Sequence, residues 1–484
     1  MTKRSFQLAA AAVEAVRPAL DALRAELEVP GDFPPEALAE ADRAAARTRS
    51  QAEDATDLEL VTIDPPGSKD LDQALHLMRD GEGYVVHYAI ADPASFVTPG
   101  GALDAALHER GMTFYGPDGR VSLHPKVLSE AAASLLPGQE RPSCLWTIRL
   151  DAAGEIVDAG VRRARVRSRE QLTYEQVQER VDGGTAGEML ALLPVIGTLR
   201  QEVERARGGV SLAIPEQEVE KANGGYRLVY RSTLEVEEWN AQISLLTGIA
   251  AAQIMRKKRV GILRTLEPAD PRDMKRLRRA AHGLGIEWPD GATYGDVIHG
   301  LDASEPAHAA FFNEATSLFR GASYLAFDGD LPPKSAHSAI AAEYAHVTAP
   351  LRRLVDRYGL EVCLAATAEE DVPEWVHEAL PGLPKTMMRS SQRASAYERE
   401  CVDLIEAIVL SGREGESFTG VVVDLDEPRN GQQGKPGRPT GTVVLADPAV
   451  RARVEGDELP LGERTQVRLV SAEPATRTVL FALS

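Results

Sequence analysis

Cysteine is scarce in this chain, and long apolar runs are missing. Its 484 residues include three cysteines that lie far apart and form no CxxC pair: Cys144, Cys363 and Cys401. This spacing argues against a zinc site or a disulfide framework and fits a reducing compartment. Without a run of about 18 apolar residues, we expect no membrane-spanning helix. Glu14 and Arg17 interrupt the alanine-rich start, and no cleavage signal follows, so we expect a cytoplasmic protein without a signal peptide.

Positive charge is also in short supply. The chain carries 54 lysines and arginines against 73 aspartates and glutamates, which gives a net charge of −19. Taken alone, this balance argues against a nucleic-acid partner, but an acidic body can still carry a basic groove. Local basic clusters occur at Arg163, Arg165, Arg167 and Arg169, at residues 256–259, and at Lys275, Arg276, Arg278 and Arg279. Each alone is more typical of a solvated face, and together they offer a path for phosphates.

The most informative segment is VTIDPPGSKDLDQA, which places Asp64, Asp70 and Asp72 around a turn after a strand-like run. Like charges in one small pocket are costly unless a cation neutralises them. Hard oxygen ligands at a turn suit Mg²⁺, or Mn²⁺ as the alternative, better than zinc. If the segment stood alone, a solvated acidic loop would be the more common interpretation.

Three further blocks follow the aspartates: YGPDGRVSLHP (115–125), EYAHVTAPLRRLVDRYG (343–359) and SAYERECVDL (395–404). With the aspartate segment, these blocks resemble the signature motifs of the RNase II family, in family order. Members of that family have an RNB domain and are 3′-to-5′ exoribonucleases. The resemblance runs from about residue 57 to the C-terminus. It implies a Mg²⁺-dependent enzyme that hydrolyses RNA from its 3′ end to nucleoside monophosphates.

We expect an α+β fold with three parts: a helical N-terminal element over 1–56, an RNB catalytic domain over 57–412 and a C-terminal OB barrel over 413–484. In the catalytic domain the patterns predict strands first, at 59–63, 84–89, 143–150 and 155–168. Helices are predicted later, at 235–256, 272–284 and 307–319. This order is typical of a mixed or antiparallel sheet surrounded by helices.

The two ends of the chain have their own patterns. Over residues 1–50 an apolar stripe, two proline-containing breaks and an alanine-rich stretch predict a helical hairpin similar to a helix-turn-helix. RNase II relatives typically carry two cold-shock barrels in this place, and about 55 residues cannot hold them. A structural brace and an RNA-binding element are equally good interpretations of this hairpin. At the other end, five short strands at 418–425, 441–446, 451–454, 466–470 and 479–483 predict the barrel, with a basic loop at 429–438.

By resemblance, Asp64, Asp70 and Asp72 are the metal and water ligands, with Asp70 and Asp72 catalytic and Asp72 the most damaging single loss. The family pattern continues with a fourth aspartate, and here that position is Gln73. A glutamine offers a neutral carbonyl oxygen and no charge. This departure leaves two interpretations open: an active enzyme, which the intact remaining motifs favour, or a weakened or silent RNA-binding member of the family.

The same resemblance implies roles for two basic residues and an acid. Arg352 matches the arginine that clamps the scissile phosphate, where a fixed guanidinium stabilises growing charge. Arg353 is a supporting RNA contact. Glu398 matches a glutamate that orients the terminal nucleotides. Outside these blocks, each of the three would be a surface residue.

Two tyrosines complete the expected RNA site. Tyr115 matches the residue that holds the 3′-terminal nucleotide, and an aromatic face stacks on any base. Tyr174 matches a tyrosine that favours RNA over DNA together with a glutamate, for which we choose Glu238 over Glu237. The expected ligand is the 3′ end of single-stranded RNA, bound by a monomer with no obligate protein partner. The third alternative is a nuclease that cuts in the opposite direction or acts on another nucleic acid, such as DNA.

Overall fold

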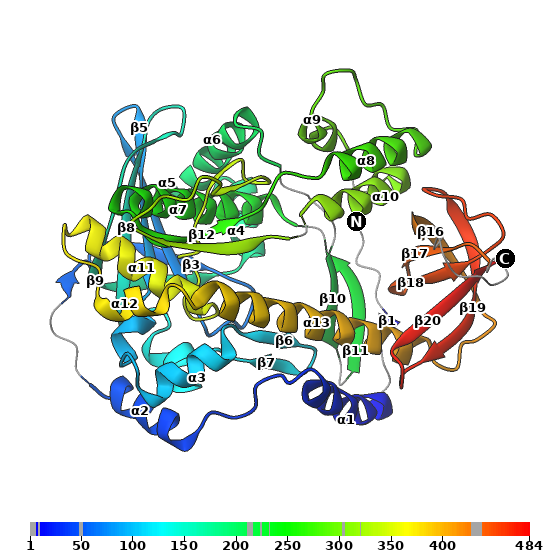
Figure 1. Cartoon of the computed structure of the whole chain (residues 1–484), viewed down its shortest axis with the longest axis horizontal. Coiled ribbons are helices and arrows are strands. Elements are labelled where there is room, and N and C mark those ends of the chain that lie inside the picture. Colours follow the sequence, from blue (N-terminus) through cyan, green and yellow to red (C-terminus); the bar gives the residue numbers. More distant parts are fainter. Residues whose placement is uncertain are drawn as a thin grey trace.

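The computed structural model describes residues 6–7, 10–47, 52–210, 216–222, 225–231, 233–302, 305–319, 321–426 and 438–484. In Figure 1 a large sheet covered by helices lies at one end of the molecule and a small barrel at the other. A long helix, α13 (Leu383–Leu410), runs between them. The α+β fold expected from the sequence is confirmed.

The central sheet has six strands in the order β2-β9-β3-β4-β5-β8. They span Glu53–Asp54 (β2), Leu60–Ile63 (β3), Gln73–Asp80 (β4), Gly83–Ala91 (β5), Glu140–Leu150 (β8) and Ile156–Leu172 (β9). The first part of β9 pairs antiparallel with β8, and its last residues pair parallel with β3. Every residue of β3 is buried, as expected for a strand covered on both faces. The four strands predicted in this region are confirmed.

Helices cover the sheet and form one large core with it. They are α4 (Tyr174–Asp182), α5 (Gly187–Leu190), α6 (Leu192–Ala206), α7 (Glu235–Lys258), α11 (Leu354–Thr367) and α12 (Glu374–Ala379). Helix α7 packs against α6, α11 and α4, so it lies at the centre of this layer. Its apolar spacing predicted its position to within two residues at the C-terminal end.

Shorter elements complete this region. They include η1 (Pro93–Phe96), α3 (Ala102–Arg110), the hairpin of β6 (Phe114–Gly116) and β7 (Gly119–Val121), and η2 (Leu128–Ala132). A three-stranded sheet has the order β1-β11-β10, with β1 at Phe6–Gln7, β10 at Glu216–Ala222 and β11 at Gly225–Arg231. Two two-stranded sheets are formed by β12 (Val260–Thr265) with β13 (Ser323–Asp328), and by β14 (Ala336–His337) with β15 (Ala342–Glu343). Helices α8 (Pro271–Gly283), α9 (Tyr294–His299), α10 (Pro306–Ala315) and η3 (Thr316–Phe319) form a layer against the barrel, which Figure 1 shows.

The C-terminal strands close into a barrel in the order β16-β17-β18-β20-β19. They span Ser417–Leu425, Thr440–Ala446, Ala449–Glu455, Arg464–Glu473 and Thr478–Leu483 for β16 to β20. Strand β18 pairs parallel with β20, and the other neighbours are antiparallel. The predicted five-stranded OB-like barrel is therefore confirmed. The predicted basic loop at 429–438 lies outside the described residues except for Arg438.

The N-terminal helices form where the sequence predicts them, but they do not share a core of their own. Helix α1 (Ala10–Glu26) packs on α13 and β11, and its Val16, Leu20 and Leu23 join the apolar cluster of the barrel. Helix α2 (Pro35–Ala45) instead packs on α3 and buries alanines in the core of the sheet region. The expected hairpin is wrong in this respect, because each apolar face binds a different part of the molecule.

In the described residues, no helix has the length and apolar character needed to span a membrane.

Candidate active site

The sheet fixes both ends of the loop that carries the three aspartates. Asp64 follows β3 directly, and its backbone N–H donates to the Leu172 carbonyl of β9 at 3.0 Å. Asp72 precedes β4, and its carbonyl accepts from the N–H of Ala91 on β5 at 2.8 Å. Because β3 and β4 pair antiparallel, the loop between them begins and ends at the same end of the two paired strands. The two carboxylates at its ends are brought together by the strand pairing.

Ser134 holds the middle of the loop. Its hydroxyl donates to the carbonyl of Lys69 at 2.6 Å and accepts from the backbone N–H of Leu71 at 2.9 Å. Gly67 turns the chain with a φ of +80°, which only glycine adopts at little cost. The loop is therefore anchored to the protein on both sides of Asp70.

Asp72 is a buried carboxyl and Asp64 a half-buried one, and the acidity of both is strongly perturbed. Burial raises the pKa of Asp64 to about 7, and the charge of Asp70 adds to this, while Arg352 opposes it. Burial likewise raises the pKa of Asp72 to about 7, against the effect of Arg352 and of a hydrogen bond from the backbone of Leu351. Oδ2 of Asp64 is buried without a hydrogen-bond partner. Such a pair of carboxyls is poised to bind a cation or a proton.

Arg352 reaches the aspartates from the loop before α11. The N–H of Leu351 donates to Oδ1 of Asp72 at 2.8 Å, and Nε of Arg352 lies 3.5 Å from Oδ2 of the same carboxyl. The Arg352 side chain is about half exposed, at 48 %. It therefore faces both the buried carboxyl and the solvent from which a phosphate would arrive.

Arg353 is placed differently from its neighbour. Its guanidinium donates two hydrogen bonds to Asp356, at 2.8 and 2.7 Å, and the Asp356 side chain in turn accepts from the N–H of Ala349 at 2.7 Å. These contacts raise the pKa of Arg353, although burial opposes them. The geometry gives Arg353 the role of fixing the loop that presents Arg352, and it lends no support to the expected contact with RNA.

Asp70 has a partner that the sequence analysis missed. Nη1 of Arg120 donates to Oδ1 of Asp70 at 2.6 Å, and Nη2 donates to Glu130 at 3.1 Å. Arg120 comes from β7, inside the block that also contains Tyr115. Its position in that block could have marked Arg120 as a site residue. The local sequence pattern, however, does not indicate that β7 faces the aspartate loop.

Gln73 is held in the wall of the site by two hydrogen bonds. Its Nε2 donates to the carbonyl of Thr348 at 2.6 Å, and its Oε1 accepts from the hydroxyl of Tyr88 at 2.6 Å. The Thr348 hydroxyl lies 2.9 Å from that of Ser244 on α7. The amide thus ties β4 to the loop of Arg352, and Oε1 keeps one lone pair for a further contact.

The donor set fits a hard cation in charge and chemistry. Three neighbouring carboxylates, one of them with an unpartnered buried oxygen, are the ligands that Mg²⁺ and Mn²⁺ take. As the side chains stand, the described residues form no group of three His, Cys, Asp or Glu arranged to hold a metal ion. The guanidiniums of Arg120 and Arg352 lie against Asp70 and Asp72 instead. Arg120 occupies only Oδ1 of Asp70, so a metal ion bound at that oxygen would have to replace Arg120, whereas Oδ2 could bind one beside it.

The two tyrosines border this cluster from different elements. Tyr115 on β6 is 45 % exposed and lies within electrostatic range of Arg352, Asp70 and Asp72. Tyr174 is the first residue of α4 and lies within range of Asp64 and Arg352. Burial is the main cause that raises the pKa of both hydroxyls, so both stay protonated donors. The structure brings these expected RNA-binding residues to the aspartates.

The glutamate near Tyr174 is Glu237, whose charge contributes to the raised pKa of the tyrosine. Glu238 accepts a hydrogen bond from Gln201 at 3.1 Å instead. On α7 the two side chains point about 100° apart, so only one faces α4. The geometry favours Glu237, and the preference for Glu238 made from the sequence is not supported.

Glu398 lies on the exposed side of α13. Its neighbour Tyr397 is buried and packs over Gly116 of β6, where an added Cβ would lie 2.5 Å from the tyrosine hydroxyl. Helix α13 therefore contacts β6 through Tyr397, and Glu398 follows that contact on the exposed side of the helix. Its role at the terminal nucleotides stays a prediction.

Most of the basic clusters noted in the sequence are paired within the protein. Arg163 binds Asp92 and Glu361, Arg165 binds Asp54, and Arg167 binds Glu140. Four exposed basic side chains instead gather on one surface of α8: Arg272, Lys275, Arg278 and Arg279. The four cations of this surface take no part in the ion pairs that engage the arginines of β9, and all four are exposed.

The buried carboxyl of Asp72 predicts a stability effect that does not depend on any reaction. A carboxyl whose pKa is about 7 in the folded protein, against 3.8 ordinarily, favours folding below about pH 4, and this contribution is lost as the pH rises to about 7. With a chelator present, Asp72→Asn should therefore stabilise the protein more near pH 8 than near pH 5, because at pH 5 only about the first third of this loss has occurred. The difference should be at most a few kcal/mol, at about 1.4 kcal/mol per pKa unit. Urea unfolding at both pH values measures this. Equal effects at the two values would contradict the raised pKa.

Comparison with known proteins gives two family matches. Residues 52–362 match the RNB domain, and residues 416–484 match the RNase II-type exonuclease C-terminal S1 domain. The exosome complex exonuclease RRP44 of Homo sapiens is 28 % identical over 323 residues, covering 63 % of this chain and 33 % of the relative.

Two solved structures show the same fold. The RNase R of Mycoplasma genitalium in complex with ribose methylated single-stranded RNA matches with a TM-score of 0.83 and 17 % identity, over 96 % of this chain and 77 % of that one. The yeast Ssd1, described as a pseudonuclease, matches with a TM-score of 0.68 and 16 % identity, over 93 % and 53 %. The chain spans about a third to a half of the length of the curated relatives it matches. Because the RNB match covers more than half of its residues, the chain belongs to the RNase II family of RNB-domain proteins.

Proposed function

We propose that this protein is a 3′-to-5′ exoribonuclease that hydrolyses single-stranded RNA to nucleoside 5′-monophosphates with a divalent metal ion. One observation carries the proposal: the half-buried carboxyl of Asp64 and the buried carboxyl of Asp72 meet the half-exposed guanidinium of Arg352, with Tyr115 and Tyr174 beside them. Cleavage at the end of an RNA requires carboxylates and a cation at the scissile phosphate, and flanking aromatic rings hold the terminal bases.

Each side chain has a distinct task in this mechanism. Asp64, Asp70 and Asp72 would hold Mg²⁺ or Mn²⁺, which when bound lowers the pKa of a water and neutralises phosphate charge. Arg352 donates hydrogen bonds to the phosphate oxygens and stabilises the charge that grows on them. Tyr115 and Tyr174 give the last nucleotides an aromatic face and a hydroxyl donor. With Glu237 near Tyr174, a 2′-hydroxyl has two polar partners, which favours RNA over DNA.

A strand-end assay with labelled RNA tests the proposal. Single-stranded RNA labelled at its 5′ end should shorten progressively, and RNA labelled at its 3′ end should release labelled mononucleotide at once. Both reactions should stop in excess chelator and resume with Mg²⁺. Internal cuts, or cleavage that persists with the chelator, would contradict the proposal.

A silent RNA-binding protein is the second candidate, because Gln73 replaces a carboxylate and Arg120 binds Asp70. The pseudonuclease Ssd1 shows that this fold occurs without the activity. The labelled-RNA assay separates the two, since the silent protein would bind RNA without shortening it.

Gln73 yields a prediction about the metal requirement. Gln73→Asp adds a carboxylate next to Asp72, so the Mg²⁺ concentration for half-maximal single-turnover cleavage should fall several-fold. The matched control is Gln73→Asn. Its side chain has the same length as that of Gln73→Asp and also loses the contact with Thr348, but it adds no charge. A requirement for Gln73→Asp equal to or above that of Gln73→Asn would mean that position 73 does not contact the metal.

The proposed ligand is the 3′ end of single-stranded RNA. One relative is named an exosome complex exonuclease, so the expected monomeric state without a protein partner stays a prediction. The elution volume of the purified protein, compared with its mass of 52.3 kDa, measures it.

A further inference from the structure

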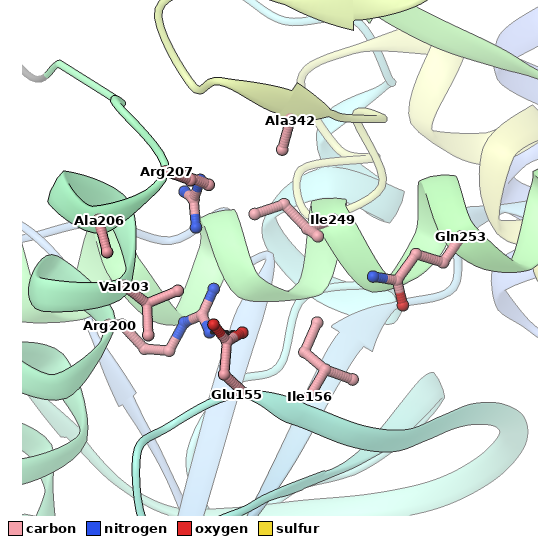
Figure 2. Close-up of a pocket in the computed structure, with 9 residues that line it drawn as sticks. All are labelled: Glu155, Ile156, Arg200, Val203, Ala206, Arg207, Ile249, Gln253 and Ala342. Carbon is pink, nitrogen blue, oxygen red and sulfur yellow. Dashed lines mark ion pairs between the residues drawn. The ribbon is translucent and has the colours of Figure 1, made fainter.

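A second polar pocket lies between α6, α7 and the β14–β15 hairpin. Its volume is about 390 Å³, inside the range of about 300–1,000 Å³ that small-molecule sites occupy. Arg200 and Arg207 line one side, and Ile249 of α7 and Ala342 of β15 line the other. Figure 2 shows both guanidiniums at the pocket, with Glu155 beside Arg200.

Arg200 is an arginine that the fold buries almost completely, at 2 % exposed. Its Nη1 donates to the carbonyl of Gly154 at 2.7 Å and lies 3.7 Å from the carboxylate of Glu155. Its Nε is buried and has no hydrogen-bond partner. Leaving a buried donor of a charged group without a hydrogen bond costs free energy. An acceptor bound at this N–H would remove that cost.

Arg207 repeats this arrangement from the end of α6. Its Nε donates to the carbonyl of Ile340 at 2.8 Å, and its Nη2 is buried without a partner. Burial, with a smaller contribution from the positive charge of Arg207, lowers the pKa of Arg200 to about 10, although Glu155 and Glu204 oppose the effect. Two guanidiniums close enough to disfavour each other would both be stabilised by an anion between them.

The pocket is separate from the aspartate cluster. On α7, Ser244 contacts Thr348 beside the aspartate site, whereas Ile249 and Gln253 line the pocket five and nine residues later, about 7 to 14 Å along the helix. Ile156 is the first residue of β9 and Glu155 directly precedes it, whereas Leu172 at the other end of the strand adjoins Asp64. A ligand here would therefore occupy a second site and would not compete with the RNA end.

We propose that this pocket binds a phosphate group, either as free phosphate or as the monoester of a small molecule. Two guanidiniums with unused N–H groups suit a dianion with several acceptor oxygens better than a carboxylate. The apolar side chains of Ile156, Val203 and Ile249 leave room for an organic group beside the phosphate. This assignment is independent of the proposed nuclease activity.

Calorimetric titration of the full chain in excess chelator tests the site. Inorganic phosphate, uridine 5′-monophosphate and uridine are the three ligands, so their comparison identifies the source of the phosphate. Uridine should not bind. Arg207→Gln should weaken phosphate binding at least about tenfold. Ala206→Phe, at an exposed position of the pocket wall, should do the same by filling space, with both cations retained.

Two variants serve as matched controls. Arg205→Gln removes the same charge from an exposed position on the same turn, and Arg352→Ala removes the cation of the aspartate site. Both should bind phosphate within about threefold of the wild-type protein. The proposal is overturned if neither phosphate nor the monophosphate binds, if Arg207→Gln and Ala206→Phe leave binding unchanged, or if Arg352→Ala alone abolishes it. The last result would place the phosphate at the aspartates.

Discussion

Asp72→Asn is expected to abolish the release of nucleotides from RNA while leaving RNA affinity almost unchanged. The substitution keeps the size of the side chain and an oxygen that can accept from the N–H of Leu351. It removes the negative charge at the most buried of the three carboxyls, which is 5 % exposed. A metal site that loses a buried charge loses transition-state stabilisation. We expect single-turnover cleavage to fall by at least about a hundredfold, or about 2.7 kcal/mol.

RNA affinity depends on other parts of the molecule. RNA can be bound without the charge of Asp72. The groups available for this are the exposed face of Tyr115, the basic surface of α8 and the guanidinium of Arg352. Single-turnover cleavage and filter binding, measured in parallel, separate the two effects. The matched control is Asp57→Asn, which removes the same charge from an exposed position before β3. Cleavage by Asp72→Asn within about tenfold of the wild-type rate would show that Asp72 is not the critical carboxylate.

The elements of the fold could be predicted because their patterns are local. Strand β3 is a short apolar run, and β17 and β18 alternate between buried and exposed residues. Helix α7 keeps apolar residues at helical spacing over most of its length. The error at the N-terminus has a different origin. The apolar stripe of Val16, Leu20 and Leu23 predicts a helix, but it does not indicate which surface packs against it. In the structure, α13 and the barrel pack against it.

The candidate site was predictable only as far as motifs reach. The motifs named Asp64, Asp72, Arg352 and Tyr115, and the structure places these residues together. Three partners depend on tertiary contacts between distant segments: Arg120 on Asp70, Asp356 on Arg353, and Thr348 on Gln73. The choice between Glu237 and Glu238 depends on the rotation of α7 relative to α4, which a motif does not contain. The buried pair Arg200 and Arg207 lies in no motif.

Arg352→Ala is expected to slow the chemical step far more than it weakens binding. Arg352 lies 3.5 Å from Asp72 and is half exposed, so its guanidinium is aimed at the position where a phosphate would meet the carboxylates. Arg353 holds this loop through Asp356, and Arg352 is therefore preorganised. Loss of one preorganised donor to a developing anion typically costs about 10²–10³ in rate, or about 2.7–4 kcal/mol. Single-turnover cleavage at saturating RNA measures this rate.

Arg352→Lys is the variant that distinguishes charge from geometry. A lysine keeps the positive charge next to Asp72 and loses the planar fork that binds two phosphate oxygens together. If Arg352 acts on the transition state, the lysine variant should bind RNA like the wild-type protein and still cleave at least about tenfold more slowly. A full rate with lysine would mean that charge alone is needed. An unchanged single-turnover rate in Arg352→Ala, together with a raised dissociation constant, would make Arg352 a general phosphate contact, because only binding in the ground state would then depend on it.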